Sequence, residues 1–583
     1  MPTIQQIKEK RKITPVIEIG GTLYEGKDHG EAIKKAEQAG EDISNVNREK
    51  DGMFMVDGKL YTREEAKKEF GISHSHEIGQ PKVLITTDEW LAPALALKIQ
   101  NEGINIFLAE KRNSNILKGT IKRIPYADRL EFSKECDLVI YEDKSNHGEV
   151  QELRKQGISV LGGSKLSDKL ELDRMWGNKI AKQCGIKVPE MLPFTDFKEM
   201  ATFIKERKGK WVLKQCGKID EIKGLSFVAK MDNSEDLLDF LPLLEKNWVE
   251  GIKPDFVLQE KVEGHEFAIG SFFNGKEFMK DGEGQELCEE NFEHKALFPG
   301  GLGESTGEQY TIQKMVRAKD SKLFMETLDK CRELLKAIDY RGDFDINCII
   351  NEKGAYFLEF TPRMGVPSTI GMIEIHKSSW YELLKCMADG TQPKDFKYDA
   401  RWNIVSWAYC KPFPAVNFHQ LAGEFDNPQG LEEIKQTISF RMSDSEGILI
   451  NFKKDFTKED WSHIHPDGIR FRNDRLEIAN KDGYILTATA MDDTVEGAGK
   501  KLEDILKKII VPRIFWRNDF DRSNYHKSKY DLEKWGYLLT PEQLKEKITA
   551  EQNKKSLKEE ENKKVKNEEK RKVIREKLKK LVL

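Results

Sequence analysis

The sequence has no run of 18 apolar residues and no closely spaced pair of cysteines. Because a transmembrane helix needs about 20 apolar residues, the first absence argues against a helical membrane span. The N-terminus, MPTIQQIKEKRKITP, lacks the apolar core of a secretory signal. The eight cysteines are scattered singly, so we expect reduced, mostly buried thiols and no structural zinc site. Together these absences predict a cytoplasmic protein without a membrane partner.

An excess of either charge is also missing. The chain has 96 basic and 100 acidic residues and a net charge of -4, which gives no indication of a nucleic-acid or anionic-membrane partner. Hydrophobic residues make up 38% of the chain, enough to build real cores. A length of 583 residues allows about four domains.

Changes in sequence pattern along the chain predict an α/β protein of several domains. Strands alternate with helices after Pro81 (KVLITT, INIFLAE, CDLVIYED, ISVLGG), which is typical of a parallel sheet. Strands dominate 255–360, and SDKLELDRMWGNKIAKQCG predicts one long helix. We place the domains at 1–78 (accessory module), 79–163 (parallel α/β), 164–400 (central), 401–538 (C-terminal α/β) and 539–583 (charged tail).

The two ends of the chain differ from its middle. VIEIGGTLYEG predicts two strands around Gly20–Gly21, GEAIKKAEQAG a short amphipathic helix, and MFMVDGKLYT a hairpin turning at Asp57–Gly58. GISHSHEIGQ has the composition of a linker. After about residue 538 lysine and glutamate dominate, which favours a solvated helix or a disordered tail. The alternative is a helix that binds another protein, since IREKLKKLVL has some amphipathic spacing.

The strongest candidate for chemistry is RGDFDINCIINEKGAYFLEFTPRMG, which predicts a hairpin turning at 352–354. Asp345 lies on one arm and Glu359 on the other, so the pairing brings both carboxylates to one face. Two neighbouring carboxylates repel each other unless a cation such as Mg²⁺ neutralises them. Arg363 follows, with the geometry to hold a transferring phosphoryl group. The alternative is an ordinary acidic surface hairpin.

Three weaker patterns surround that hairpin. Lys214 ends an apolar strand, and Lys223 precedes a glycine in a polar loop, so both are suited to gripping phosphates. Gln259 and Glu260 end another strand and Glu266 follows a turn, a place where an adenine edge and a ribose could bind. HKALFPGGLGESTGE reads as a glycine-rich segment between strands, either a mobile lid over a ligand or a disordered loop.

The order of these motifs resembles the ATP-grasp superfamily and, within it, the phosphoribosylamine–glycine ligases (glycinamide ribonucleotide synthetases), over roughly residues 81–540. The strings that carry the resemblance are ELDRMWGNKIAKQCGIKVPE, WVLKQCGKIDEIKGLSFV, VLQEKVEGHEF, FEHKALFPGGLGESTGE and YFLEFTPRMG. DGYILTATAMDDTVEGAGKKL and WRNDFDRS are similar to the family's C-terminal domain. The resemblance implies an ATP-grasp fold and an enzyme of purine biosynthesis that joins a carboxylate to an amine.

The resemblance also implies roles for individual residues, with ATP and Mg²⁺ (or Mn²⁺) as cofactors and small molecules as substrates. The implied ATP contacts are Arg174, Lys214, Lys223, Gln259, Glu260, Val262 and Glu266. The implied metal ligands are Asp345, Glu359 and Thr361. Arg363 and Lys223 would be catalytic, and the loop facing the substrates would contain His294, Lys295, Thr306, Gly307 and Glu308.

The chain departs from the family pattern at three places. Thr361 stands where the family has asparagine, and Val366-Pro367-Ser368 replaces an acidic Asp-Pro-Glu. The first strand of the parallel sheet ends in Thr86-Thr87-Asp88-Glu89-Trp90 instead of a glycine-rich loop. Two alternatives therefore stay open: a related ligase with another amine, for nucleotide or base modification, and a nucleotide-binding scaffold without catalysis. The N-terminal module is similar to one appended to phage proteins.

Overall fold

The computed structural model describes residues 13–19, 22–26, 29–41, 43, 46, 52–56, 59–62, 65, 81–88, 90, 92–143, 147–216, 226–248, 253–410, 413, 445–480, 483–539, 543, 546 and 549. Lys223, the two turns at Gly20–Gly21 and Asp57–Gly58, the linker and almost all of the charged tail lie outside these residues. The chain divides into two compact units, Met1–Tyr525 and His526–Leu583. None of the described helices is long and apolar enough to cross a membrane.

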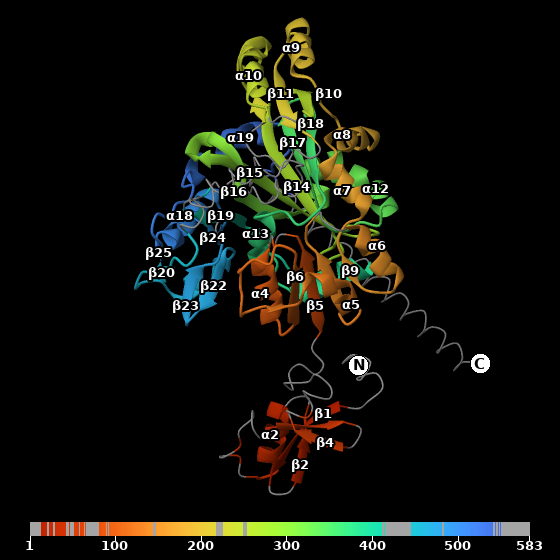
Figure 1. Cartoon of the computed structure of the whole chain (residues 1–583), viewed down its shortest axis with the longest axis vertical. Coiled ribbons are helices and arrows are strands. Elements are labelled where there is room, and N and C mark those ends of the chain that lie inside the picture. Colours follow the sequence, from red (N-terminus) through yellow and green to blue (C-terminus); the bar gives the residue numbers. More distant parts are fainter. Residues whose placement is uncertain are drawn as a thin grey trace, which may run out of the picture. The chain divides into compact units, whose positions relative to one another are not determined.

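The described part of the N-terminal module contains a four-stranded antiparallel sheet and the helix α2 (Figure 1). Its elements are β1 (Ile13–Ile19), β2 (Thr22–Glu25), α2 (His29–Gln38), β3 (Gly52–Val56) and β4 (Lys59–Thr62), with strand order β2-β1-β3-β4. Ala32 and Ala36, four residues apart on one face of α2, are fully buried, as are Val16 and Phe54. The strand pairs and the helix expected here are confirmed.

The predicted parallel sheet is also confirmed. Its order is β7-β6-β5-β8-β9, and every neighbouring pair runs parallel. The strands are β5 (Lys82–Thr87), β6 (Asn105–Glu110), β7 (Lys122–Arg123), β8 (Leu138–Tyr141) and β9 (Val160–Leu161). The helical elements between them are α4 (Pro93–Asn101), η2 (Tyr126–Asp128), α5 (Arg129–Ser133) and α6 (His147–Lys155). Continuous apolar runs such as LVIY suit strands buried on both faces of a sheet.

The single long helix expected over SDKLELDRMWGNKIAKQCG is wrong. Two helices, α7 (Lys165–Leu172) and α8 (Arg174–Gln183), meet at Asp173. The Asp173 side chain accepts a hydrogen bond from the backbone N–H of Trp176 and so caps the start of α8. A short acidic side chain competes with helical backbone bonding in this way, which breaks the helix and places Arg174 at its first turn.

A small lobe follows, built from a four-stranded antiparallel sheet of order β10-β13-β11-β12. Its elements are β10 (Met191–Phe194), α9 (Phe197–Glu206), β11 (Trp211–Gln215), β12 (Phe227–Val228), η4 (Asp232–Ser234), α10 (Glu235–Lys246) and β13 (Phe256–Glu260). Helices α9 and α10 lie beside this sheet (Figure 1). They supply side chains to one apolar cluster with its strands, including Met200, Ile204, Leu237 and Leu241. This packing holds β11 and β13, which carry several of the predicted nucleotide contacts.

The largest sheet has eight strands in the order β18-β17-β14-β15-β16-β19-β24-β21. They are β14 (His265–Asn274), β15 (Leu287–Phe298), β16 (Leu302–Arg317), β17 (Arg341–Asn351), β18 (Gly354–Thr361), β19 (Trp402–Tyr409), β21 (Ile464–Pro466) and β24 (Tyr484–Asp492). Strands from both the predicted central and C-terminal domains belong to it. The boundary proposed near residue 400 therefore does not interrupt the sheet.

The described residues contain further elements. The helical ones are η5 (Pro299–Gly301), η6 (Ala318–Asp320), α11 (Lys322–Glu326), η7 (Leu328–Cys331), α12 (Arg332–Ala337), α13 (Ser368–Ile375), α14 (Trp380–Asp389), α17 (Lys458–Ser462), α18 (Val495–Leu506), η8 (Phe520–Arg522) and α19 (Asn524–Lys534). The strands are β20 (Asn451–Phe452), β22 (Ile469–Arg472), β23 (Arg475–Ile478) and β25 (Ile509–Ile510). All eight cysteines are free, and six of them are buried, as the sequence predicts.

The glycine-rich segment is not the loop that the sequence suggests. Its residues form the ends of β15 and β16, joined by the tight turn Pro299–Gly301. The register shifts twice between these strands, which accommodates extra residues in a long hairpin. Gly303 has a φ of 83°, and its Cα packs closely enough on the Phe298 ring that a Cβ would lie 2.8 Å from it. The segment is therefore a paired hairpin and not a disordered loop, and its role as a lid over a ligand stays a prediction.

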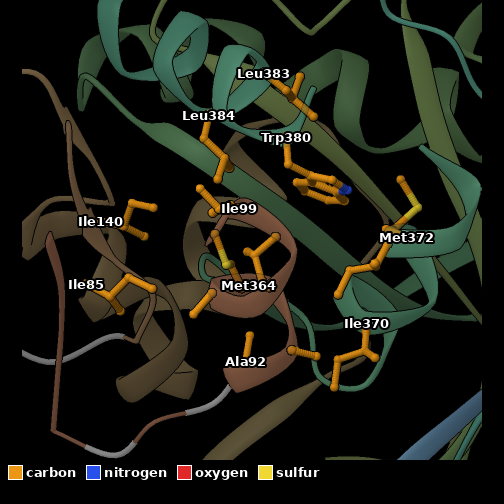
Figure 2. Close-up of a cluster of buried hydrophobic side chains, with 14 of the residues drawn as sticks. Ile85, Ala92, Ile99, Ile140, Met364, Ile370, Met372, Trp380, Leu383 and Leu384 are labelled. Atoms are coloured by element: carbon orange, nitrogen blue, oxygen red, sulfur yellow. The ribbon is translucent and has the colours of Figure 1, made fainter. Parts of the chain in front are cut away.

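A shared apolar core joins the parallel sheet to the eight-stranded sheet. Ile85 and Ile140 of the parallel sheet, Ile99 of α4, and Trp380 and Leu384 of α14 belong to one buried cluster (Figure 2). Glu102, just after α4, binds the start of α14 as well. Its carboxylate accepts hydrogen bonds from the backbone N–H of Trp380 at 2.9 Å and of Tyr381 at 3.1 Å. Helix N-termini favour negative charge, so this contact fixes α14 against the parallel sheet.

Replacing Glu102 with alanine should therefore lower the free energy of unfolding by about 2 kcal/mol, since two N–H groups lose a charged acceptor. The measurement is the urea midpoint of the circular-dichroism transition. The matched control is Glu333→Ala, an exposed glutamate whose ion pair is with Lys336 on its own helix. An equal, small shift in both variants would contradict the proposed contact.

Candidate active site

One face of the eight-stranded sheet carries the predicted metal ligands together with Glu266 and Lys295. Side chains two residues apart on a strand point to the same face. The register places Asn347 of β17 opposite Glu359 of β18 and, on its other side, opposite Ala268 of β14. Asn291 of β15 lies opposite Ala268 in turn. A row of polar side chains therefore crosses the sheet, interrupted by one small residue.

Lys295 connects three carboxylates at one end of this face. Its Nζ lies 2.8 Å from Glu266 Oε1 and 2.8 Å from Glu293 Oε2. A third carboxylate oxygen, Glu359 Oε1, lies 3.5 Å away. Burial opposes the charged form, but the three carboxylates together raise the pKa of Lys295 well above its usual value. The Lys295 ammonium therefore stays charged and links carboxylates from three strands, β14, β15 and β18.

Arg174 is a second cation that contacts Glu359. Its Nη1 donates to Glu359 Oε2 at 3.3 Å, and its Nε donates to the carbonyl of Gln215 at 3.0 Å. Burial would favour a protonated Glu359, but the nearby cations Lys295 and Arg174 outweigh it and hold its pKa well below the usual range. Glu359 is therefore a carboxylate at neutral pH, placed where α8, β11 and β18 meet.

Lys214 on β11 is a third cation beside Glu359. Burial and then the Arg174 guanidinium lower the pKa of Lys214 to about 8, while Glu359 acts in the opposite direction. Lys214 makes no hydrogen bond or ion pair with the residues that the structure describes. A partly buried ammonium without a bonded anion is suited to receive one from a ligand.

The strand predicted to hold the adenine lies next to β11. Gln259 pairs with Val212 in the register, and its side chain is 2% exposed. Its Oε1 has no hydrogen-bond partner among the described residues. Glu260 at the end of β13 is exposed, and Val262 just beyond is half-buried. Glu266, predicted to bind the ribose, instead bonds Lys295.

The predicted metal ligands share a face but are not directly opposite each other. Asp345 pairs with Thr361, and Glu359 pairs with Asn347, so Asp345 and Glu359 are diagonal neighbours. Within the described residues no group of three or more His, Cys, Asp or Glu side chains is arranged to hold a metal. The donors present are nonetheless all oxygens, and Asn347 Oδ1 and Asp345 Oδ1 are buried without hydrogen-bond partners. Such donors fit Mg²⁺, which takes its remaining ligands from phosphates and water.

The residues predicted on the β15–β16 hairpin divide into two groups: those near the charged cluster, and His294, which lies in the interior. Lys295 points into the charged cluster, and Thr306 donates to the Lys295 carbonyl at 3.2 Å. Glu308 is half-buried, and burial together with the Glu293 charge raises its pKa well above the usual value. Gly307 has a φ of 93° with no atom near its missing Cβ. These residues lie beside the cluster.

His294 belongs to the protein interior. Its ring stacks on Tyr310 with centroids 3.8 Å apart, and its Nε2 accepts the backbone N–H of Asn524 at 2.9 Å. Its Nδ1 therefore carries the proton and donates to the carbonyl of Tyr310 at 3.2 Å. Burial, assisted by the Arg517 charge, lowers the pKa of His294 to about 3. The structure does not bring His294 into the charged cluster around Lys295.

Arg363 already has an acidic partner. Its Nε and Nη2 both donate to Glu171 Oε1 at 3.3 Å, and its Nη1 donates to the Met364 carbonyl at 3.2 Å. A guanidinium tied to α7 in this way can hold a phosphoryl group only by turning or sharing its donors. The other predicted catalytic residue, Lys223, lies outside the described residues.

Sequence reasoning missed four polar residues that line the same face: Glu289, Asn291, Glu293 and Asn347. All four are buried or nearly so. Asn347 donates to Glu293 Oε2 at 2.7 Å, which joins β17 to β15. The signal was present in LCEENFEHK, where polar residues recur at every second position of an otherwise buried strand. It was overlooked because glutamates are ordinarily surface residues.

Comparisons with known proteins find a matching family model and several curated relatives. Residues 172–369 match the family model described as phosphoribosylglycinamide synthetase, ATP-grasp (A) domain. Curated relatives carry the name phosphoribosylamine–glycine ligase. The one from Clostridium acetobutylicum is 23% identical over 342 residues, or 55% of this chain and 77% of that protein. The one from Methanocaldococcus jannaschii is 22% identical over 459 residues, or 76% of this chain and 96% of that protein.

Solved structures share the fold. The phosphoribosylamine–glycine ligase from Thermotoga maritima superposes with a TM-score of 0.54 at 16% identity, covering 75% of this chain and 99% of that one. A biotin carboxylase from Campylobacter jejuni gives a TM-score of 0.50 at 13% identity, covering 79% and 96%. The matched span 172–369 contains Arg174, Lys214, Lys295 and Glu359. The ATP-grasp fold expected from the sequence is confirmed.

The low pKa of Lys214 predicts proton uptake when nucleotide binds. Near pH 8 roughly half of the free protein has a neutral Lys214, and phosphate oxygens would restore the ammonium. Affinity for ATP should therefore fall as the pH rises through 8. Calorimetric titration at pH 8 in buffers of different ionisation enthalpy should show uptake of about half a proton for each ATP.

Lys214→Arg keeps the charge at every pH, so uptake should disappear while binding persists. Lys210→Arg is the control, since Lys210 lies just before the same strand and pairs with Asp232 at 3.4 Å. Uptake that survives in Lys214→Arg would contradict the assignment.

Proposed function

We propose that this chain is an ATP-grasp ligase that joins a carboxylate to an amine through an acyl phosphate. The reaction we favour is that of the phosphoribosylamine–glycine ligases: ATP, glycine and 5-phosphoribosylamine yield glycinamide ribonucleotide, ADP and phosphate. The observation that carries the proposal is the set of cations around Glu359, namely Lys295, Arg174 and Lys214, inside the matched span.

The first step transfers the γ-phosphoryl group of ATP to the substrate carboxylate. A carboxylate oxygen attacks the γ-phosphorus, the bond to the β–γ bridging oxygen breaks, and ADP leaves. Both reactants are anions, so the protein must neutralise charge and align them. Lys214 is suited to bind the phosphate chain, since it is a cation without a bonded anion in the described structure. Arg174 and Lys295 hold Glu359 ionised beside it.

The second step forms the C–N bond. The amine attacks the acyl carbon, phosphate leaves with the electrons of the C–O bond, and the nitrogen releases a proton. Water would hydrolyse the acyl phosphate, so the site must exclude it. The residues we propose for the divalent ion that accompanies ATP are Glu359 and Asn347, with Asp345 and Thr361 next to them in the register. Bound there, Mg²⁺ would neutralise charge on the phosphates.

A related ligase with a different amine is the second candidate, favoured by the end of β5. Phosphoribosylamine–glycine ligases have a glycine-rich loop at this place, whereas this chain has Thr86-Thr87-Asp88. Asp88 is engaged by Lys111 at 2.9 Å and by the Tyr126 hydroxyl at 3.0 Å. Side chains therefore fill the place where glycines would leave backbone open to a substrate. This supports retained ATP chemistry with an altered amine pocket.

The decisive assay measures ADP release from ATP and Mg²⁺ in the presence of glycine and freshly made phosphoribosylamine. We expect release that needs both substrates and falls at least about 100-fold in Glu359→Ala, since charge stabilisation of a transferring phosphoryl group is lost. Glu352→Ala, an exposed residue at the turn before β18, is the matched control and should keep full activity.

Changing the amine in the assay distinguishes the two proposed ligase reactions from each other and from a scaffold without catalysis. Release with glycine and another amine, but not with phosphoribosylamine, would favour the second reaction. ATP binding without ADP release under any mixture of carboxylates and amines would contradict a ligase and leave a nucleotide-binding scaffold.

A further inference from the structure

Two histidines and a glutamate meet where α13 packs against the last strands of the eight-stranded sheet. Glu374 lies near the end of α13, His465 lies in β21 and His463 lies just before it, two residues away and so on the same face. His463 Nδ1 lies 2.7 Å from Glu374 Oε1, and His465 Nε2 lies 3.7 Å from the same oxygen. Side chains 89 positions apart in the chain therefore share one polar contact.

Thr489 of β24 completes this group. Its hydroxyl donates a hydrogen bond to Glu374 Oε1, so it accepts one from the His465 Nε2–H at 2.8 Å. Its backbone N–H donates to the His463 carbonyl at 2.9 Å. Glu374 thus accepts hydrogen bonds from His463 and Thr489 together, and His465 orients the Thr489 hydroxyl.

The group is buried except at His463. The side chains of Glu374 and His465 are 10% and 8% exposed, and Thr489 is fully buried. The His463 side chain is 26% exposed. A buried carboxylate is costly without a bonded partner, so Glu374 depends on these contacts. Of the four described side chains, His463 is the one that both bonds Glu374 and reaches solvent, where it can exchange its proton.

The charged groups around the His463 ring are mostly acidic. Glu459 Oε1 of α17 lies 3.7 Å from His463 Nε2. Asp460, the next residue of α17, is paired with Lys508 at 2.9 Å. Helix α4 also packs against β21, and Lys98 is its one titratable side chain. The surroundings therefore favour the protonated imidazole.

These surroundings separate the titrations of the two partners. The hydrogen bond to Glu374 raises the pKa of His463, although burial opposes this, and the nearby acids add to the effect. Burial alone would favour a neutral Glu374, but the hydrogen bonds from the two histidines outweigh it and lower the pKa of Glu374 to about 2. Near neutral pH the contact therefore changes from an ion pair to a neutral-donor hydrogen bond when His463 loses its proton.

We propose that the contact between His463 and Glu374 is a pH-sensitive latch that holds α13 to the last strands of the sheet. Loss of the His463 proton removes the Coulomb attraction and leaves the hydrogen bond, so the latch weakens without being broken. Helix α13 begins at Ser368, shortly after Arg363, and the Ser368 carbonyl accepts the side-chain N–H of Gln313 at 3.0 Å. The latch therefore acts at the far end of the helix that leads away from the candidate active site.

The sign of the effect follows from the direction of the His463 shift. The folded protein binds this proton more tightly than the unfolded chain, so the latch stabilises the fold fully below the ordinary histidine pKa of about 6.5. That contribution is lost as the pH rises through the higher pKa of the folded state. The attachment of α13 should therefore be firmer in mildly acidic than in alkaline solution.

The first test is a nuclear magnetic resonance titration of the full chain with ring-labelled histidine and without nucleotide. The His463 signal is assigned by its loss in His463→Asn, in which an amide N–H replaces Nδ1 and cannot titrate. Its midpoint should lie above about 6.5 in wild type and shift downward in Glu374→Gln. The matched control is Glu459→Gln, which alters the exposed acid beside the same ring and should shift the midpoint less.

The second test is hydrogen exchange of α13, read by mass spectrometry and corrected for the intrinsic pH dependence of exchange. In wild type the α13 amides should exchange at least about 3-fold faster near pH 9 than near pH 6. In His463→Asn this difference should disappear, which a merely structural role of the side chain would not produce. Circular dichroism verifies that each variant is folded.

A wild-type midpoint at or below the ordinary histidine value would overturn the proposal, as would a midpoint that Glu374→Gln leaves unchanged. The same pH dependence of α13 exchange in wild type and His463→Asn would also overturn it. Both measurements are made without substrates, so their outcome is independent of the ligase assay.

Discussion

The ammonium of Lys295 is the interaction on which the rest of the site depends. It is shared by Glu266, Glu293 and Glu359, which come from three strands of one sheet. Buried charges are tolerated only when they are paired, and removing one partner leaves the others uncompensated. Without Lys295 three acids would face one another in a partly dry environment. Their mutual repulsion would disrupt the surface that a metal–nucleotide complex requires.

The segment that contains Arg517 and Asp519 also holds the hairpin that carries Lys295. Arg517 donates to the carbonyl of Ala296, the residue after Lys295, at 2.9 Å. Asp519 accepts the backbone N–H of Gly300 at 2.8 Å, and the two side chains form a buried ion pair with a closest distance of 2.6 Å. The hairpin that carries Lys295 is therefore held at its turn by residues more than 200 positions away.

The sequence predicts the elements well where the pattern is local. The βαβ alternation after Pro81 and the β17–β18 hairpin are confirmed, because apolar runs and turn residues determine them directly. Two local expectations were wrong. Asp173 divides a helix by capping it, and the glycine-rich segment pairs as strands, since long-range partners outweigh local composition.

Some residues of the site could be named from the sequence, and others could not. Lys295, Arg174 and Glu359 were named from motif order, and their contacts depend on strands brought together by tertiary folding. Glu289 and Asn291 were not named, because nothing local indicates that Gly270 lies between Glu289 and Asp345. A single sequence shows which residues alternate on a strand. It does not show which strands are neighbours.

The central claim is that the polar face of the eight-stranded sheet is a cation and nucleotide surface organised around Glu359. Anomalous X-ray scattering from crystals grown with Mn²⁺ and ADP tests it most directly. The account predicts a manganese peak beside Glu359 and the nucleotide phosphates. Nucleotide and manganese bound elsewhere on the protein, with this face empty, would contradict it.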